Sequence, residues 1–332
     1  MDPLSHALLG TSATLQKANK TEHIKPAIIC GIFAGMFPDL DILVRMPDNP
    51  MFGLSFHRHF SHSICFVPMG ALVVTAFLSV TFLRKRLFKE TYWFCFIAMA
   101  CHGLLDAMTN YGTHLFLPFT ERREAFSVIS IIDPIFTGAL LIGVVCSGIT
   151  KNKLPSMVAL AFALIYLSFG VVQHMTVKQN MYELAEKRGH RITQMAISPS
   201  IGNLFAWRGQ YKHEGKMYVD AYHVSPWTTH QVYEGASYPL FVMSEEIRQK
   251  IGPVQTKDIE YFTFFADGWI AEYPKGSGIY GDMRYSTLPS GLHPLWGITF
   301  QPDQPDKHVS YISTRVRKEG DVKKLWGMIK GE

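Results

Sequence analysis

Residues 64–83 and 154–176 of this chain contain no aspartate, glutamate, lysine or arginine. A helix needs about 20 predominantly apolar residues to cross a hydrocarbon core about 30 Å thick, and both runs are long enough. Residues 25–44, 91–110 and 126–150 form three further apolar runs of similar length, each of which contains one or two carboxylates. The sequence therefore predicts a polytopic α-helical membrane domain of about five membrane helices.

The alternative to membrane insertion is a large buried helical core in a soluble protein. Apolar runs of this length with basic clusters between them are typical of membrane proteins, so insertion is favoured. Residues 1–16 lack the basic start and the small-residue cleavage site of a signal peptide. We expect them to form a short retained helix that enters the membrane only in part.

The character of the chain changes near residue 177, where charged residues become frequent. This change predicts two domains, a helical membrane domain at residues 1–176 and a soluble, mainly antiparallel β domain at residues 177–332. "FAWRGQYKHEGKMYVDAYHV" has the alternation of a hairpin with its turn at "HEGK". Further strands are predicted in "DIEYFTFFADGWIAEYP", "GIYGDMRYS", "LWGITFQP" and "HVSYISTRV", and a short helix in "SEEIRQKIG".

Basic residues fall in alternate connections between the apolar runs, which predicts the orientation because short basic loops stay in the cytoplasm. Residues 45–60 and 111–125 are then outside, as is the C-terminal domain, which could cover a site on that face. The connections expected inside carry Lys17, Lys20 and Lys25, then Arg84, Lys85, Arg86 and Lys89, then Lys151 and Lys153.

This topology brings the intramembrane carboxylates and the histidines expected to pair with them to the outer face. A carboxylate inside a bilayer costs at least a few kcal/mol unless it is paired or faces a polar cavity, so each is a functional candidate. The residues that converge are His6, Asp39, Asp41, His57, His59, His62, His102, Asp106 and Asp133.

Three short motifs supply most of these side chains. "HGLLD" puts His102 and Asp106 on one helical face, although a hydrogen-bonded structural pair would have the same spacing. "FPDLD" puts Asp39 and Asp41 where a proline ends a helix, and a metal or an arginine would relieve their repulsion. A solvated helix end is the alternative for that motif.

The third motif, "HRHFSHS", puts His57 in a loop and His62 at a helix entrance, which suits two ligands from different segments. A solvent-exposed role explains His59 equally well. Arg58 has two candidate roles, since its guanidinium can pair with a ligand carboxylate or bind an anionic oxygen of the substrate.

Together these residues form a nitrogen and oxygen donor set without thiolate, which favours zinc, with manganese or iron as alternatives, in a site of one or two divalent ions. Asp39, Arg58 and Asp133 are the candidate catalytic residues. For Asp133, in "SIIDP", the roles of ligand, orienting residue and general base all stay open. The predicted ligands are His6, Asp39, Asp41, His57, His62, His102 and Asp106.

Other compositional signals exclude several classes of protein. All five cysteines lie in apolar runs at irregular spacing, which excludes a zinc ribbon and a disulfide framework in the polar half. Basic residues do not form a nucleic-acid groove, so no nucleic-acid partner is expected. The tryptophans of the polar half are more typical of a core or a membrane interface than of a carbohydrate or lipid site.

The blocks "MDPLSHALLG", "GMFPDLDIL", "HRHFSHS" and "CHGLLDAMTNYGTHLFLPF" resemble, in this order, the signature blocks of the YdjM-like family of membrane-bound, metal-dependent hydrolases. The resemblance covers residues 1–175, and "NLFAWRG" is similar to the polar tail of longer members. It implies a multi-pass protein of the inner membrane whose block histidines and aspartates bind metal. The family is in turn similar to zinc-dependent phospholipase C and nuclease P1. His59 departs from the family pattern, which has a small or variable residue there.

The functional prediction is a metal-dependent hydrolase at the outer membrane face that cleaves a phosphoester or another ester of a lipid-linked or membrane-proximal substrate. A transporter or metal-handling protein is the alternative, although it would need polar residues in the inner halves of the spans as well. A scaffold with a structural metal is a third hypothesis. The sequence leaves the substrate and the oligomeric state open.

Overall fold

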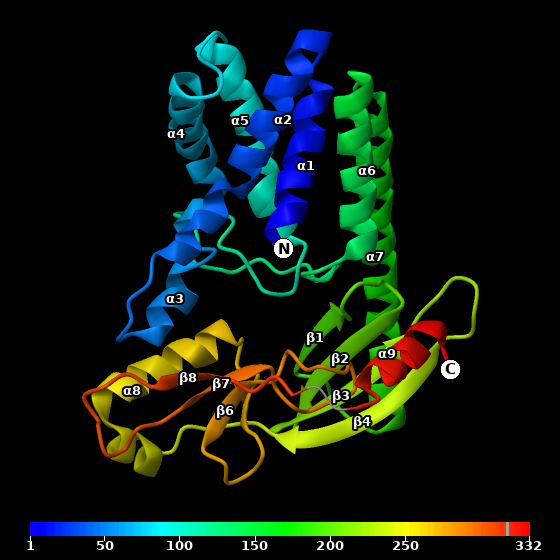
Figure 1. Cartoon of the computed structure of the whole chain (residues 1–332). Coiled ribbons are helices and arrows are strands. Elements are labelled where there is room, and N and C mark those ends of the chain that lie inside the picture. Colours follow the sequence, from blue (N-terminus) through cyan, green and yellow to red (C-terminus); the bar gives the residue numbers. More distant parts are fainter. Residues whose placement is uncertain (317–318) are drawn as a thin grey trace. The chain divides into compact units, whose positions relative to one another are not determined.

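The computed structural model describes residues 1–316 and 319–332, which form two compact units (Figure 1). Unit 1 contains residues Met1–Val44, Phe56–Val172 and Ile201–Asn203, and unit 2 contains Arg45–Ser55, Gln173–Ser200 and Leu204–Glu332. Each unit has its own hydrophobic core. Residues 45–55, from the predicted membrane domain, belong to the second unit.

Unit 1 is a helical bundle in which α1 packs against α2, α5 and α6. The α1 helix confirms the short helix expected at the start of the chain. A Cβ atom on Gly31 would lie 2.3 Å from the Thr11 Cα atom, so α1 and α2 touch through their main chains. The elements are α1 (Pro3–Gln16), α2 (Thr21–Met36), η1 (Phe37–Leu43), η2 (Phe60–His62), η3 (Ile64–Phe66), α4 (Val67–Val80), α5 (Phe88–Ala107), α6 (Pro134–Thr150) and the first part of α7 (Leu154–Lys187).

The structure does not support five membrane helices. Among the described residues, two helical segments are long and apolar enough to cross a membrane, Thr21–Leu43 and Leu154–Lys187. A third is obtained if Pro50–His62 and Ile64–Val80, which meet at a bend of 60°, are counted as one broken span. Helix α6 has 17 residues, and α5 carries charge near both ends, which leaves its uncharged part shorter than the roughly 20 residues required.

Prolines set two helix boundaries that the hydropathy pattern could not place. Helix α2 ends at Met36 and gives way to the 3-10 helix η1, because Pro38 has no N–H with which to continue the α-helical pattern. Helix α6 begins at Pro134 with Asp133 as its N-cap, so residues 126–133 are not helical. The expected continuous helix over residues 126–150 is therefore wrong in its first third.

Unit 2 contains two four-stranded antiparallel sheets, in the orders β1-β2-β3-β4 and β5-β6-β7-β8. The C-terminal half of α7 packs on the first sheet, since the Met181 Sδ atom would lie 2.7 Å from a Cβ atom on Gly209. The elements are α3 (Pro50–Phe56), β1 (Gln194–Pro199), β2 (Ala206–His213), β3 (Lys216–His223), β4 (Gln231–Pro239), α8 (Glu245–Phe265), β5 (Ile270–Glu272), β6 (Ile279–Asp282), β7 (Trp296–Thr299), β8 (Ser310–Ser313) and α9 (Asp321–Lys330).

The predicted antiparallel β domain is confirmed in its main features. The hairpin is formed by β2 and β3, and β6, β7 and β8 occupy the other predicted strand segments. In "DIEYFTFFADGWIAEYP", β5 forms near the end of the predicted segment, but its first part, "DIEYFTFF", is wrong because these residues belong to α8. Their buried members, Asp258, Ile259, Phe262 and Phe265, recur every three or four residues, and this helical period outweighs the β propensity of the aromatic side chains.

Candidate metal centre

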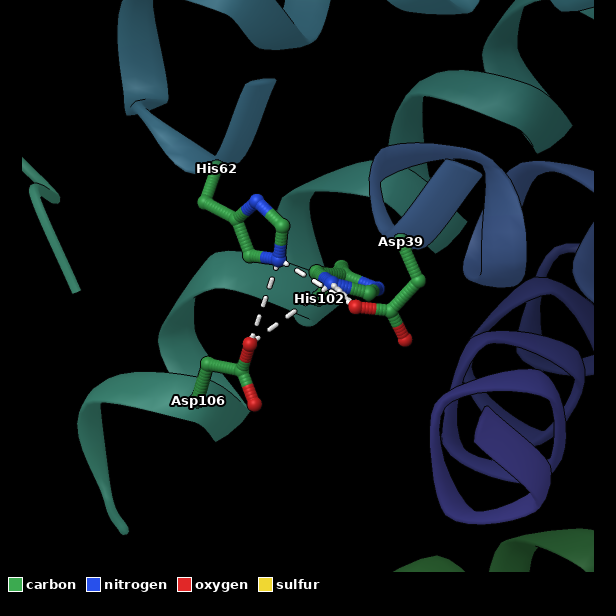
Figure 2. A group of neighbouring side chains, drawn as sticks. All are labelled: Asp39, His62, His102 and Asp106. Carbon is green, nitrogen blue, oxygen red and sulfur yellow. Dashed lines mark ion pairs between the residues drawn. The ribbon is translucent and has the colours of Figure 1, made fainter. Parts of the chain in front are cut away.

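Four side chains from three separate segments meet at one end of the helical bundle (Figure 2). Asp39 comes from η1, His62 from η2, and His102 and Asp106 from one face of α5. His62, His102 and Asp106 are buried, and the Asp39 side chain retains 15% of its exposure. The i, i+4 spacing predicted to matter in "HGLLD" does present both side chains to the same point.

Four of the separations between donor atoms of this group are close to the edge lengths of a tetrahedral metal site. Nε2 of His62 lies 3.4 Å from Asp39 Oδ1 and 3.3 Å from Asp106 Oδ2. Nε2 of His102 lies 3.5 Å and 3.7 Å from the same two oxygens. Zinc binds histidine nitrogen and carboxylate oxygen at about 2.0–2.2 Å, which makes the edges of a tetrahedral site about 3.3–3.6 Å. The four donors therefore have nearly the separations that a bound zinc ion requires.

The ring nitrogens that face one another in this group have no hydrogen bond of their own. Nε2 of His62 and of His102, together with Asp106 Oδ2, are buried without a hydrogen-bond partner. The opposite nitrogen of His102 lies 2.6 Å from the Gly35 carbonyl oxygen, to which it donates. This contact leaves the Nε2 lone pair directed at the cluster, as metal-binding histidines usually have it.

The main chain of α5 also sets the position of His62. A Cβ atom on Gly103 would lie 2.3 Å from the His62 carbonyl oxygen. Only glycine allows η2 to lie this close to the helix that carries His102 and Asp106.

Asp41, Ser61 and His57 form a second layer behind His62. Ser61 Oγ donates to Asp41 Oδ2 at 2.6 Å, and the Arg58 main-chain N–H donates to the same oxygen at 3.2 Å. His57 Nδ1 lies 2.7 Å from Asp41 Oδ1, and His62 Nδ1 lies 3.3 Å from Asp41 Oδ2. Asp41, His57 and His62 also have donor atoms close enough to hold an ion. Because both Asp41 oxygens already accept hydrogen bonds, the geometry favours a carboxylate that orients His62.

Arg58 links the cluster to the loop that follows α5. Its Nη2 lies 3.1 Å from Asp106 Oδ1 and its Nη1 donates to Thr109 Oγ1 at 3.1 Å. Its guanidinium carbon lies 4.7 Å from the centre of the Tyr111 ring. Nε of Arg58 is buried without a hydrogen-bond partner, so one donor is left for another group. The predicted pairing of Arg58 with a ligand carboxylate is therefore present.

His6 lies beside the group without belonging to it. Its Nε2 is 3.0 Å from Asp106 Oδ1, and its ring stacks on that of His102 with 3.7 Å between centroids. The α-amino group of Met1 contacts the same Asp106 oxygen. Both groups hold the Asp106 carboxylate so that its second oxygen points to the two histidine nitrogens.

Asp133 and His59 lie outside both groups of candidate ligands. Asp133 Oδ1 accepts the main-chain N–H groups of Ile135 and Phe136, and its Oδ2 accepts the hydroxyl of Tyr166 at 2.9 Å. These contacts are those of a helix cap. The His59 ring stands edge-on to that of His114, with 5.0 Å between centroids.

The residues of the site that sequence analysis missed are Ser61, Thr109, Tyr111 and the glycines at positions 35 and 103. Serine in "FSHS" and threonine in "DAMTN" are common side chains with no chemical signature. Gly35 accepts a hydrogen bond only through its carbonyl oxygen, and Gly103 only allows a main-chain carbonyl to come close, so neither glycine gives a signal in the sequence. The interval between Asp106 and Thr109, one helical turn, was the one signal that could have indicated the latter.

The donor set fits a divalent cation. Three carboxylates, those of Asp39, Asp41 and Asp106, face one guanidinium and one α-amino group, so negative charge is in excess when the histidines are neutral. A buried excess of negative charge is costly unless a cation compensates it. With two imidazoles and no thiolate, the site suits zinc, manganese or iron.

Comparison with known proteins agrees with the resemblance seen in the sequence. The family described as YdjM inner membrane protein matches residues 1–177. The chain belongs to this family. The match covers the whole candidate metal centre and most of the helical bundle. No curated protein and no solved structure matches the chain.

Proposed function

We propose that this YdjM family member is a membrane-embedded, metal-dependent hydrolase that cleaves a phosphoester, or another ester, of a lipid-linked or membrane-proximal substrate. The observation that carries the proposal is the meeting of Asp39, His62, His102 and Asp106 with unpartnered donor atoms. Mixed nitrogen and oxygen donors with a partly exposed carboxylate are typical of hydrolytic metal sites.

The surroundings of the site favour a substrate from the lipid phase. Leu40 and Leu43, on the same short helix as Asp39, are 52% and 72% exposed. Phe60, two residues from His62, is 48% exposed. Because large apolar side chains flank the donors, the hydrolysed bond would lie near the head group of a lipid or lipid carrier.

Contacts at the other end of the bundle support a site on the outer face of the inner membrane. Lys153 Nζ donates to Gln16 O at 3.1 Å, and Arg86 donates to Glu22 O, so the basic connections gather there. Short basic loops stay in the cytoplasm. A multi-pass arrangement with the metal centre and the C-terminal domain outside follows from this rule.

A bound divalent ion would lower the pKa of a coordinated water and polarise the ester. Oδ2 of Asp39 is buried without a hydrogen-bond partner and would accept a proton from the attacking water. The free Nε–H of Arg58 would bind an anionic substrate oxygen. Hydrolysis then adds the water oxygen to phosphorus or carbon, breaks the bond to the ester oxygen, and gives a proton to the leaving alcohol.

Four protein donors within 4.8 Å of one another also favour a second function, a scaffold with a structural metal, because four-coordinate structural sites leave no open position. Transport is less favoured. Within residues 1–316 and 319–332, both candidate ligand groups contain His62, so they lie at one place, whereas a carrier needs sites accessible from each side.

Metal analysis of detergent-purified protein, with a screen of phosphodiester and ester substrates, tests the proposal. We expect about one transition-metal ion per chain or more, and hydrolysis that chelation abolishes and metal restores. His102→Ala and Asp106→Ala should lose both metal and activity. His23→Ala, which removes an imidazole from α2 that belongs to neither ligand group, is the matched control.

Two results would contradict it. If both ligand variants kept their full metal content, the metal centre proposed here would be wrong. Metal loss without any change in a measured cellular phenotype, at normal expression, would favour the scaffold.

A further inference from the structure

Helix α7 changes character near residue 175. Outward-facing residues in its first part are apolar, and Ile165, Val172 and Met175 are 69%, 58% and 65% exposed. The first charged residue of the helix is Lys178. Exposed apolar side chains suit a lipid surround, and exposed charges suit water. The boundary between the two environments therefore falls close to Met175.

The length of the helix gives the same boundary independently. Helix α7 begins at Leu154, directly after Lys153. At 1.5 Å per residue, the part from Leu154 to Gln173 spans about 30 Å, the thickness of a hydrocarbon core. With Lys153 at one surface, Gln173 lies at the other.

Gln173, at the membrane boundary of α7, is hydrogen-bonded to the start of the loop formed by residues 224–230. Its buried side-chain amide donates to the carbonyl oxygens of Val224, at 2.8 Å, and of Leu204, at 3.2 Å. At the other end of the loop, His230 Nδ1 lies 3.5 Å from Asn180 Nδ2. Residues 224–230 therefore run beside α7, from the level of the boundary towards the water-facing part.

The loop presents an indole to its surroundings. Trp227 is 78% exposed, and its main-chain N–H donates to Ser225 Oγ at 3.2 Å. Thr228 Oγ1 lies 2.9 Å from His223 Nε2, so both sides of the turn are fixed. Figure 1 shows this connection between β3 and β4 projecting beyond the strands. An exposed tryptophan on an ordered loop is costly in water and favourable among lipid head groups.

We infer that residues 224–230 enter the head-group layer of the bilayer through Trp227. The partner is the phospholipid interface itself, and the contact fixes the depth at which α7 crosses the membrane. The inference depends on α7 as a span and is independent of the proposed hydrolysis.

Fluorescence in nanodiscs tests this contact with the full-length protein. Phosphatidylcholine brominated either near the glycerol or near the chain ends quenches indoles according to depth. The difference between wild type and Trp227→Phe reports Trp227 alone, since the five other tryptophans are common to both. We expect this component to be quenched about twofold or more strongly by the shallow bromines.

Trp326→Phe is the control, because Trp326 is another exposed indole of unit 2, 57% exposed on α9, which packs on β2 and β3. It should leave the shallow component intact. The inference fails if brominated lipids quench the fluorescence of Trp227→Phe as strongly as that of wild type. It also fails if Trp326→Phe removes the component that the shallow bromines quench. It also fails if an aqueous quencher, but no brominated lipid, reaches Trp227, or if the lipid signal needs two copies per disc.

Discussion

The imidazole of His102 donates a hydrogen bond from Nδ1 to the main-chain carbonyl of Gly35, 2.6 Å away. A Cβ atom at position 35 would lie 2.7 Å from the His6 carbonyl oxygen, so Gly35→Ala should separate α2 from α1 and misalign this carbonyl. We expect metal affinity to fall about tenfold or more, as for other partners of metal-binding histidines. Competition with a chromogenic chelator measures the affinity. Gly138→Ala, where a Cβ atom would meet nothing within 4 Å, should leave it unchanged.

The Asp41→Asn variant tests whether Asp41 orients His62 or binds the metal itself. If Asp41 holds His62, the amide keeps the Ser61 contact but loses the charge, and metal affinity should fall by about 10- to 100-fold, with full occupancy recovered in excess metal. The same titration on His62→Ala should show no recovery. Loss of all binding in Asp41→Asn would make Asp41 a ligand, as the sequence predicted.

Substitutions of Asp133 distinguish a helix cap from a catalytic base. Asparagine is also a good N-cap, so Asp133→Asn should keep its metal and its activity. Asp133→Ala loses the cap of α6 and should be less stable by about 0.5–2 kcal/mol, measured by thermal unfolding in detergent. An Asp133→Asn variant that is metal-loaded but inactive would instead support the role of base predicted from the sequence.

His114 should make stability depend on pH. Burial, with smaller contributions from Arg123 and His59, lowers its pKa to about 4 in the folded protein, against about 6.5 in an unfolded chain. Between these values the unfolded chain binds more protons, so the free energy of unfolding should decrease as pH falls from about 6.5 to about 4 and level off below. The low pKa of His114 has a physical reason in its Nδ1 atom, which is buried without a hydrogen-bond partner. A proton on this nitrogen would have no acceptor.

The measurement is the melting temperature of wild type and His114→Asn across that pH range. The variant should show the smaller decrease on acidification, and His23→Asn should behave like wild type. Parallel curves for wild type and His114→Asn would contradict the prediction.

The convergence of distant ligands could be predicted because it depended on two robust signals. The i, i+4 interval fixes the shared face of His102 and Asp106, and Pro38 fixes the end of α2 just before Asp39. The packing of α2 against α5 then brings these two C-terminal ends together. The division between ligands and their supporting residues could not be predicted, because the hydrogen bonds of Asp41 depend on the turn between His57 and His62.

That turn contains a left-handed residue that no sequence rule indicates, since Arg58 has a φ of 62°. Its main-chain N–H and its guanidinium thereby reach Asp41 and Asp106 at once. The number of spans was overestimated for a different reason. Hydropathy runs ignore helix ends, and the apolar residues before Pro134 are irregular main chain.

Because residue 103 is glycine and has no Cβ atom, the His62 carbonyl packs directly on α5. This contact sets the distance between His62 on η2 and the donors His102 and Asp106 on α5. Main-chain atoms have no alternative rotamers, so the distance between these donors should stay the same when the ion leaves. A residue with no chemistry of its own would then control which ions fit, and alanine at position 103 would act as a spacer favouring larger cations.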